Sequence, residues 1–444
     1  MKRKPVVAIV GRPNVGKSTL FNALAGEKAA IVKDTPGVTR DRLYRDTDWA
    51  GHAFLLADTG GIEPESKDLI FAQMREQAQI AIDTADVILF MCDLKSGVTD
   101  ADLDIATMIR KSGRPIVLAV NKVDDHVRQE AEVYEFYNLG LGEPHPVSAE
   151  GRRGIGELLD AVCVHLPAIP EDDEEDTDIR VAVIGRPNAG KSSLINRLTG
   201  ENRLIVSDVA GTTRDAIDTR VRCDGREYVF IDTAGLRRKS KIKEDLERYM
   251  ILRAVSAIER SDVCVLMIDA VDHVTEQDAH IAGIAHERGK GMIIAVNKWD
   301  LVEKDNRTVK EYTDRIREVL SFMPYAEILF LSAKSGQRTG RLFPLIDKVA
   351  DNASLRITTG LLNDVLTKAL AMQQPPTDKG RPLRVYYMTQ TGVKPPTFVL
   401  FVNDKKLMHY SYTRYIENRI RETFGFQGTP LRFLIRERKD KQGA

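Results

Sequence analysis

The stretch GRPNVGKS, residues 11–18, follows the apolar run PVVAIV and leads into TLFNALAG. In the pattern GxxxxGK[ST], glycines let backbone N–H groups surround a phosphate chain, and the helix that follows favours negative charge at its N-terminus. The stretch therefore predicts a phosphate-binding loop between a strand and a helix. The pattern returns as GRPNAGKS at 185–192, an offset of 174 positions (185 minus 11), so two such loops are predicted.

Four further motifs recur in the same order after each loop. They are GVTRD (37–41) and GTTRD (211–215), DTGG (58–61) and DTAG (232–235), NKVD (121–124) and NKWD (297–300), and SAE (148–150) and SAK (332–334). Five ordered motifs that occur twice indicate a duplicated domain.

The length of 444 residues fits about three domains, at roughly 100–200 residues per domain. Between the repeats lies EDDEEDTD (171–178), an acidic run that repels itself and is typical of a linker. The expected organisation is a first repeat at 4–168, an acidic linker at 169–178, a second repeat at 179–352, a C-terminal domain at 353–438 and a tail at 439–444.

Each repeat alternates short apolar runs with longer helical patterns, beginning with VVAIV and then residues 17–25. This alternation predicts an α/β fold, a mostly parallel sheet flanked by helices on both faces. Ligands of such sheets bind at the carboxyl ends of the strands, and all five motifs directly follow predicted strands. The motif positions and the predicted topology therefore agree.

The four cysteines, Cys92, Cys163, Cys223 and Cys264, lie far apart without a CxxC pair. This spacing indicates a reducing compartment and neither a disulfide framework nor a zinc site. The N-terminal apolar run is too short for a signal peptide, and no run reaches the roughly 18 apolar residues of a membrane span. We expect a cytoplasmic protein without a membrane partner.

The phosphate loops supply the expected catalytic residues Lys17 and Lys191, which should reach the β and γ phosphates. The hydroxyls of Ser18 and Ser192, and the strand-ending carboxylates Asp58 and Asp232, suit Mg²⁺. The remaining nucleotide-binding residues expected in the loops and in DxxG are Gly11, Arg12, Pro13, Asn14, Val15, Gly16, Gly185, Arg186, Pro187, Asn188, Ala189, Gly190, Thr59, Gly60, Gly61, Thr233, Ala234 and Gly235.

The NKxD motifs predict which base is bound. The carboxylates of Asp124 and Asp300 can accept hydrogen bonds from the N1–H and exocyclic amine of guanine, which adenine does not present. The expected supporting residues are Asn121 and Asn297, which bridge loops, Lys122 and Lys298 along the base, and the backbone of Ser148, Ala149, Ser332 and Ala333. We therefore expect two sites for GTP and GDP.

These motifs resemble the EngA/Der family of tandem GTPases in ribosome assembly, and the resemblance covers nearly the whole chain. It implies two P-loop GTPase domains, a C-terminal KH-like domain, GTP hydrolysis with Mg²⁺, and maturation of the large ribosomal subunit. The implied partners are ribosomal RNA or a precursor of that subunit, and we expect a monomer.

The resemblance also assigns two switch segments, 33–46 and 207–220, in which Thr39 and Thr213 are expected to bind Mg²⁺ and the γ phosphate. After DxxG, where many small GTPases carry a water-orienting glutamine, the chain has Ile62 and Leu236. Similar GTPases are slow and hold potassium beside the phosphates, which gives this role to Asn14 and Asn188. An open alternative is that both pockets bind nucleotide without turnover.

The C-terminal domain is predicted to have the order α-β-β-α-β. Residues 381–444 contain thirteen Lys and Arg against five Asp and Glu, a net charge of +8 that leaves −8 on the rest of the chain. This charge suits phosphate contacts, for which Arg432, Arg436 and Arg438 are candidates. GFQG (425–428) has the GxxG spacing of KH loops, but Pro430 and a strand follow it, which favours a helix C-cap at Gly425.

Two alternatives to a GTPase that docks on ribosomal RNA remain open. A membrane-associated or septum-associated GTPase is disfavoured because the sequence has neither an apolar anchor nor a basic amphipathic helix. An RNA-binding scaffold with nucleotide-sensing but catalytically inert pockets would differ by releasing no phosphate from GTP.

Overall fold

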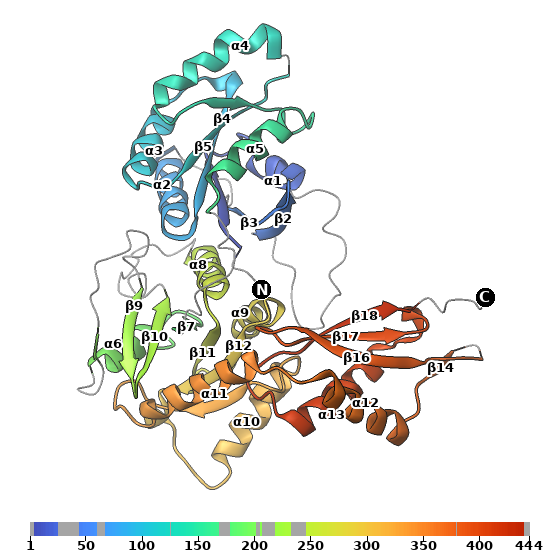
Figure 1. Ribbon diagram of the computed structural model, residues 1–444. Coiled ribbons are helices and arrows are strands. Elements are labelled where there is room, and N and C mark those ends of the chain that lie inside the picture. The colour runs from blue at the N-terminus through green and yellow to red at the C-terminus, as the bar shows by residue number, and fades with distance from the viewer. Residues whose placement is uncertain are drawn as a thin grey trace, which may run out of the picture.

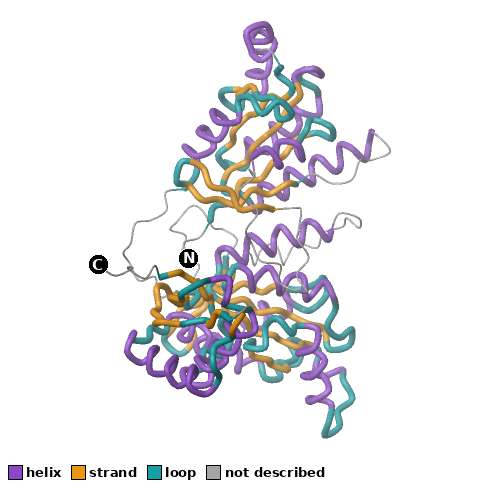
Figure 2. Tube along the Cα trace, turned by 90° about the vertical axis from the view of Figure 1, so that its right-hand side faces the viewer, coloured by secondary structure: helices purple, strands orange, loops and turns teal. Residues whose placement is uncertain are grey.

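The computed structural model describes residues 4–24, 44–59, 67–124, 126–167, 178–200, 205–206, 218–231, 246–378 and 380–438. They form two α/β units and a smaller C-terminal unit, which we define as the first unit (β1 to α5), the second unit (β7 to α11) and the C-terminal unit (α12 to β18). The first unit occupies one end of the molecule, whereas the other two lie together at the opposite end (Figures 1 and 2).

The first unit contains a six-stranded sheet of order β2-β3-β1-β4-β5-β6, in which β2 is antiparallel to β3 and the other pairs are parallel. Its strands are β1 (Val6–Gly11), β2 (Tyr44–Trp49), β3 (His52–Asp58), β4 (Val87–Asp93), β5 (Ile116–Asn121) and β6 (Pro144–Pro146). Its helices are α1 (Lys17–Leu24), α2 (Lys67–Thr84), α3 (Asp100–Lys111), α4 (His126–Tyr134) and α5 (Ile155–His165). Every residue of β1 and β4 is buried, as expected for central parallel strands covered on both faces.

The second unit repeats this plan with a seven-stranded sheet of order β13-β12-β11-β7-β10-β9-β8. Its strands are β7 (Ile179–Ile184), β8 (Ile205–Val206), β9 (Thr219–Cys223), β10 (Arg226–Ile231), β11 (Val263–Asp269), β12 (Gly291–Asn297) and β13 (Glu327–Phe330). Its helices are α6 (Lys191–Gly200), α8 (Leu246–Arg260), α9 (Glu276–Glu287), α10 (Thr308–Val319) and α11 (Leu342–Ser354). The pairs β8–β9 and β9–β10 are antiparallel, and the others are parallel.

The C-terminal unit has the predicted order α-β-β-α-β, with a short additional ribbon. Its elements are α12 (Thr359–Met372), β14 (Thr377–Asp378), β15 (Arg381–Pro382), β16 (Val385–Gly392), β17 (Thr397–Val402), α13 (Tyr410–Phe424) and β18 (Arg432–Glu437). The sheet order is β16-β17-β18, and β18 runs parallel to β17. Both helices lie on one side of this sheet, where Phe398, Leu400 and Ile416 are buried in a common core (Figure 1).

The first and second units meet through α2 and α8, and buried side chains from both units form one continuous hydrophobic cluster. A polar contact lies beside it, because Arg288 pairs with Asp46 of β2 at 2.7 Å and with Glu259 at 3.0 Å. Burial alone would raise the pKa of Asp46, but the pairing with Arg288 and the hydrogen bonds from Arg288 and Lys4 hold it below its usual value. The first unit thus contacts the second through apolar packing of α2 on α8 and through an ion-pair network around Arg288, next to α9.

The second and C-terminal units are joined by backbone hydrogen bonds. The N–H of Met292 donates to the carbonyl of Gly428 at 2.6 Å, and the N–H of Gly428 donates to the carbonyl of Tyr325 at 2.8 Å. Gly428 has φ 76, and a Cβ there would lie 2.2 Å from Cγ2 of Val349, so only glycine fits this junction. Because one of these bonds comes from β12 itself and the other from Tyr325, just before β13, the C-terminal unit is an extension of the second unit.

The structure refines two expectations about the C-terminal unit. Gly425 caps α13, with its N–H donating to the carbonyl of Arg421 at 2.9 Å, which confirms the predicted helix end. Arg432 was a candidate phosphate contact, but its guanidinium donates to the carbonyl of Glu287 at 3.3 Å, and burial and the nearby Arg288 lower its pKa. Arg432 therefore belongs to the contact with the second unit, which corrects that expectation.

Candidate nucleotide sites

The predicted phosphate loop of the first unit connects the carboxyl end of β1 to the start of α1. Asn14 has φ 64 and Gly16 has φ 96, so the loop contains two left-handed residues that turn its backbone around Lys17. The Lys17 ammonium donates to the carbonyls of Gly11 and Arg12, both at 2.6 Å. The lysine is buried at the centre of the loop, where its charge would meet a phosphate chain.

The second loop has the same conformation. Asn188 has φ 60 and Gly190 has φ 97, and the Lys191 ammonium donates to the carbonyls of Gly185 and Arg186 at 2.7 Å and 2.6 Å. Two loops that differ at one residue, Val15 against Ala189, thus adopt one geometry in two contexts.

Both loop lysines have lowered pKa values. Burial lowers the pKa of Lys17 to about 8, an effect that Asp58 opposes and Arg12 supports. Burial also lowers the pKa of Lys191 to about 8, with Asp278 acting in the opposite direction. Anionic phosphates would favour the charged form of each lysine, so nucleotide binding and protonation are linked at both sites.

The asparagine of each NKxD motif fastens the phosphate loop to the base-binding end of the site. Asn121 donates from Nδ2 to the carbonyl of Val15 at 2.7 Å and accepts from the N–H of Ala149 at 2.9 Å. A Cβ on Gly16 would lie 2.5 Å from Nδ2 of Asn121, so glycine is required for this approach. The predicted bridging role of this residue is thus matched by its contacts.

Asn297 makes the equivalent contacts in the second unit. Its Nδ2 donates to the carbonyl of Ala189 at 2.8 Å, and its Oδ1 accepts from the N–H of Ala333 at 2.9 Å. A Cβ on Gly190 would lie 2.1 Å from Nδ2 of Asn297. Both sites therefore share one framework that connects three of the five motifs.

The acidic end of each NKxD motif contacts the serine of the SAx motif. Ser148 donates to Asp124 at 3.1 Å, and Asp124 is exposed beside Lys95. The hydrogen bond from Ser332 lowers the pKa of the exposed Asp300. The lowered pKa favours the ionised form of Asp300, which is the hydrogen-bond acceptor that the reading of guanine would require.

The NKxD lysines have acidic partners that the motif analysis did not identify. Lys122 donates to Asp93 at 2.6 Å and to the carbonyl of Asn14 at 3.0 Å, and Lys298 pairs with Asp269. Both aspartates end strands, β4 and β11, in corresponding positions. The aspartates hold each lysine along the wall of the pocket.

A second missed pair ties each phosphate loop to a helix. Nε of Arg12 donates to the fully buried Asp102 at 2.9 Å, and Nε of Arg186 donates to the fully buried Asp278 at 3.1 Å. In both units the aspartate belongs to a capping box, with Thr99 starting α3 or Thr275 starting α9. The sequence signal was present as TDAD (99–102) and TEQD (275–278).

Two of the three expected Mg²⁺ ligands of the first unit, Ser18 and Asp58, lie together. Ser18 donates from Oγ to Asp58 at 3.1 Å, and Thr59 donates to the carbonyl of Ile9 at 2.5 Å. A hydroxyl and a carboxylate at the end of a phosphate loop are oxygen donors that suit Mg²⁺. Eight of the expected nucleotide or Mg²⁺ ligands, and the two residues that follow the DxxG motifs, lie outside the described residues: Thr39, Gly60, Gly61, Thr213, Asp232, Thr233, Ala234 and Gly235, and Ile62 and Leu236.

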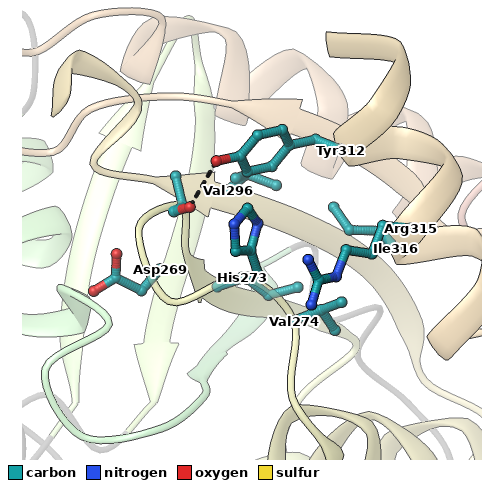
Figure 3. Close-up of a pocket in the computed structure, with 9 residues that line it drawn as sticks. Asp269, His273, Val274, Val296, Tyr312, Arg315 and Ile316 are labelled. Carbon is teal, nitrogen blue, oxygen red and sulfur yellow. Dashed lines mark hydrogen bonds between the residues drawn. The ribbon is translucent and has the colours of Figure 1, made fainter. Parts of the chain in front are cut away.

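A small cavity lies beside Asp269 between β11, β12 and α10 (Figure 3). The rings of His273 and Tyr312 lie against each other there, with centroids 4.8 Å apart, and the hydroxyl of Tyr312 donates to the carbonyl of Ala270 at 2.9 Å. The cavity borders the second candidate site through Asp269, the partner of Lys298, but no predicted nucleotide-binding residue lines it.

Within the described residues, no helix combines the length and apolar character needed to cross a membrane.

Comparison with known proteins matches residues 6–122 and 180–298 to a family described as 50S ribosome-binding GTPase. Residues 356–436 match a family described as the KH-domain-like C-terminal domain of EngA bacterial GTPase enzymes.

Similar proteins match over the whole chain. The GTPase Der of Agathobacter rectalis is 66% identical over 99% of this chain and 100% of its own length, and that of Lachnoclostridium phytofermentans is 65% identical over 98% and 99%. The FeoB G-domain of Methanococcus jannaschii is 26% identical over 37% of this chain and 98% of that chain, with a TM-score of 0.27. With two GTPase domains and a KH-like domain matched in order, the chain belongs to the EngA/Der family of tandem GTPases.

Proposed function

We propose that this chain is a double GTP-dependent switch that acts in ribosome biogenesis, in the assembly of the large subunit. The observation that carries the proposal is the pair of matching frameworks, each joining a phosphate loop, an NKxD motif and an SAx motif, in one chain with a KH-like unit. The ribosomal part draws on the family description, 50S ribosome-binding GTPase.

In each pocket the loop lysine, Lys17 or Lys191, neutralises charge on the β and γ phosphates as the terminal phosphoryl group is transferred to water. Ser18 and Asp58, with Thr39, would hold Mg²⁺ in the first unit, and Ser192, Asp232 and Thr213 would do so in the second. The metal would supply positive charge between the phosphates. Asp124 and Asp300 select guanine, and competition by ATP as effective as that by GDP would contradict this assignment.

Turnover is proposed to be slow and stimulated by potassium. Ile62 and Leu236 cannot orient water, whereas the carbonyl and amide oxygens around Asn14 and Asn188 can hold a monovalent cation against the phosphates. GTP hydrolysis is expected to fall when sodium replaces potassium at equal ionic strength. Equal rates in the two salts would contradict the role of the two asparagines.

The proposed boundaries are 4–168 and 179–352 for the GTPase domains, 169–178 for the acidic linker, 353–438 for the KH-like domain and 439–444 for the tail. We further propose a cytoplasmic monomer that binds ribosomal RNA or a precursor of the large subunit. The net charge of +8 on residues 381–444 suits such a partner.

The contacts of the first unit suggest how its nucleotide state reaches the rest of the chain. Asp46, which pairs with Arg288, lies in the predicted switch segment 33–46, and α2, which begins at Lys67, is the next element after DTGG (58–61). The γ phosphate would order those segments and so change the surface that meets α8 and α9. We therefore propose that the first unit moves against a block made of the other two.

Sedimentation with purified ribosomal subunits tests the proposed function. The full chain should migrate with 50S subunits, and not with 30S subunits, in a non-hydrolysable GTP analogue, and it should dissociate in GDP. Association with neither subunit, or the same association in both nucleotides, would contradict a nucleotide-controlled role in assembly of the large subunit.

A further inference from the structure

One face of the C-terminal sheet is not covered by α12 or α13 (Figure 1). Alternate residues of β17 point to opposite faces, so Phe398, Leu400 and Val402 face the helices and Phe401 faces away from them. Tyr387 pairs with Phe401 in the strand register, and Phe401 pairs with Arg436. These paired residues share one face, which we call the open face.

The open face carries a set of aromatic rings. Tyr387 and Phe401 are stacked, with centroids 4.3 Å apart and an interplanar angle of 13°, and both are partly exposed. The neighbouring position on β18 is Leu434, whose side chain is 43% exposed. The aromatic pair and the exposed leucine form an exposed apolar patch, and such a patch is typical of a binding surface.

Arginines border these rings. Arg436 and Arg438 are exposed, and the guanidinium of Arg438 lies 5.6 Å from the ring centroid of Tyr386. The strand alternation places no Asp or Glu on the open face of β16, β17 and β18, all of whose residues are described. Glu437 of β18 is exposed, but it alternates to the other face, where it accepts from the N–H of Lys405 at 3.1 Å. Rings and guanidinium groups on a face that carries no carboxylate match a polyanion whose units carry flat, apolar groups.

The other candidate surface for such a ligand, the GFQG segment, is occupied by contacts with the second unit. GFQG (425–428) ends at Gly428, whose N–H and carbonyl are both bonded to the second unit, and the carbonyl of Gln427 accepts from Asn352 at 2.8 Å. The backbone that a GxxG loop would offer to RNA therefore lies in an intramolecular contact.

We propose that the open face is a platform for unpaired nucleotides of RNA, with bases stacking on Tyr387 and Phe401 and phosphates on Arg436 and Arg438. This inference rests on the proposed function, since it names the surface by which the chain would contact RNA. Stacking on rings accepts any base, because every base has a π face, so the platform favours unpaired over duplex RNA.

The test measures binding of the full chain to a twelve-nucleotide oligouridine and to an RNA duplex of the same length by fluorescence anisotropy. The wild-type protein should bind the single strand more tightly than the duplex. Tyr387→Leu with Phe401→Leu keeps apolar volume but removes the stacking surface, and should weaken single-strand binding by about tenfold or more, the effect of losing one base stack. The matched control is Tyr410→Leu, a 68% exposed tyrosine on α13.

Arg436→Gln with Arg438→Gln should reduce the slope of log K against log salt, whereas the aromatic double variant should leave the slope unchanged. Loss of affinity in Tyr410→Leu equal to that in the aromatic double variant would overturn the platform, as would unchanged binding in the aromatic variant. A wild-type protein that sediments with 50S subunits but binds no oligouridine would refute the platform while the proposed function stands.

Discussion

The two α/β units have matching side-chain contacts within their candidate nucleotide sites, but they differ in how they contact the rest of the chain. In both, the loop lysine, the NKxD asparagine and the arginine–aspartate pair make the same contacts at nearly the same distances. The second unit shares backbone hydrogen bonds with the C-terminal unit, whereas the first unit meets its neighbour through side chains and apolar helices. The two sites therefore have the same arrangement of residues, but the units that carry them are attached to the rest of the chain in different ways.

The different contacts of the two units with their neighbours suggest separate roles for the two nucleotide sites. Backbone bonds to Met292 of β12 and to Tyr325, and a glycine-only junction, fix the C-terminal unit on the second unit. The first unit is held by a network around Arg288 whose partner Asp46 belongs to a predicted switch segment. On the proposed function, a change of nucleotide in the first pocket would alter a contact between units, whereas the second pocket lies within the block that the second and C-terminal units form.

The largest expected effect is on hydrolysis and tests whether the two pockets are equivalent chemically. Lys17→Ala and Lys191→Ala should each lower turnover in their own pocket by about 10²–10³-fold, the usual cost of removing one donor from a developing charge. Each single variant should keep the share of the other pocket, and the double variant should release almost no phosphate. A single variant that abolishes all turnover would show that the pockets do not act independently.

Gly428→Ala tests whether the C-terminal unit is fixed to the second unit. A left-handed backbone and overlap with Val349 should cost about 2–4 kcal/mol of the free energy of unfolding. The matched control is Gly225→Ala, which has φ 85 and no heavy atom within 4 Å of its Cβ, and should cost about 1 kcal/mol. Equal losses in denaturant titrations would mean that the junction tolerates the added methyl group.

The arginine–aspartate pairs should matter equally in both units. Asp102→Asn and Asp278→Asn keep a hydrogen-bond acceptor for Arg12 and Arg186 but remove its charge, and each should weaken GTP binding in its own pocket by about 1–2 kcal/mol. Calorimetric titration measures this loss, with the exposed Asp104→Asn as control. An effect confined to one unit would break the equivalence of the two frameworks.

The smallest expected effect is on the pH dependence of binding. Because the loop lysines have pKa values of about 8 without phosphate and must be charged to bind it, binding takes up protons above pH 8. The affinity for GTP should fall by about tenfold per pH unit at each site above that value and stay flat below it. Titrations in buffers of different ionisation enthalpy at pH 8.5 count the protons, and no uptake would contradict the lowered pKa values.

The sequence predicted what depends on local pattern and repetition. The phosphate loops, the strand-ending motifs and the order of elements around α13 were all readable, because glycine spacing and apolar periodicity act over a few residues. The edge strand β2 was not predicted because YRDTDW is polar and only one of its six residues is buried, so it has no apolar run. Asp93 was missed as the partner of Lys122 because the two lie 29 residues apart and meet only when β4 and β5 pair.

Contacts between units were also beyond the sequence. GFQG predicts a helix end, and Gly425 provides it, but nothing in that stretch indicates that Gly428 would meet Val349, which lies on α11 of another unit. The charge of Arg432 predicted a phosphate contact, yet its position on β18 turns it towards Glu287. Interfaces depend on how whole surfaces fit, which short patterns do not encode.

Distances between attached dyes test most directly whether the first unit moves against the block formed by the second and C-terminal units. Cys163 and Cys223 would first be replaced by serine, since the other two cysteines are buried. Dyes at Tyr137→Cys and Met372→Cys, both exposed positions, report on the first and C-terminal units. Dyes at Val309→Cys and Met372→Cys report on the second and C-terminal units.

The account predicts that the first distance differs between GDP and a non-hydrolysable GTP analogue, that the second does not, and that Ser18→Ala removes the change while Ser192→Ala leaves it. If the first distance is the same in both nucleotides, or if only Ser192→Ala removes the change, the first unit is not the moving switch.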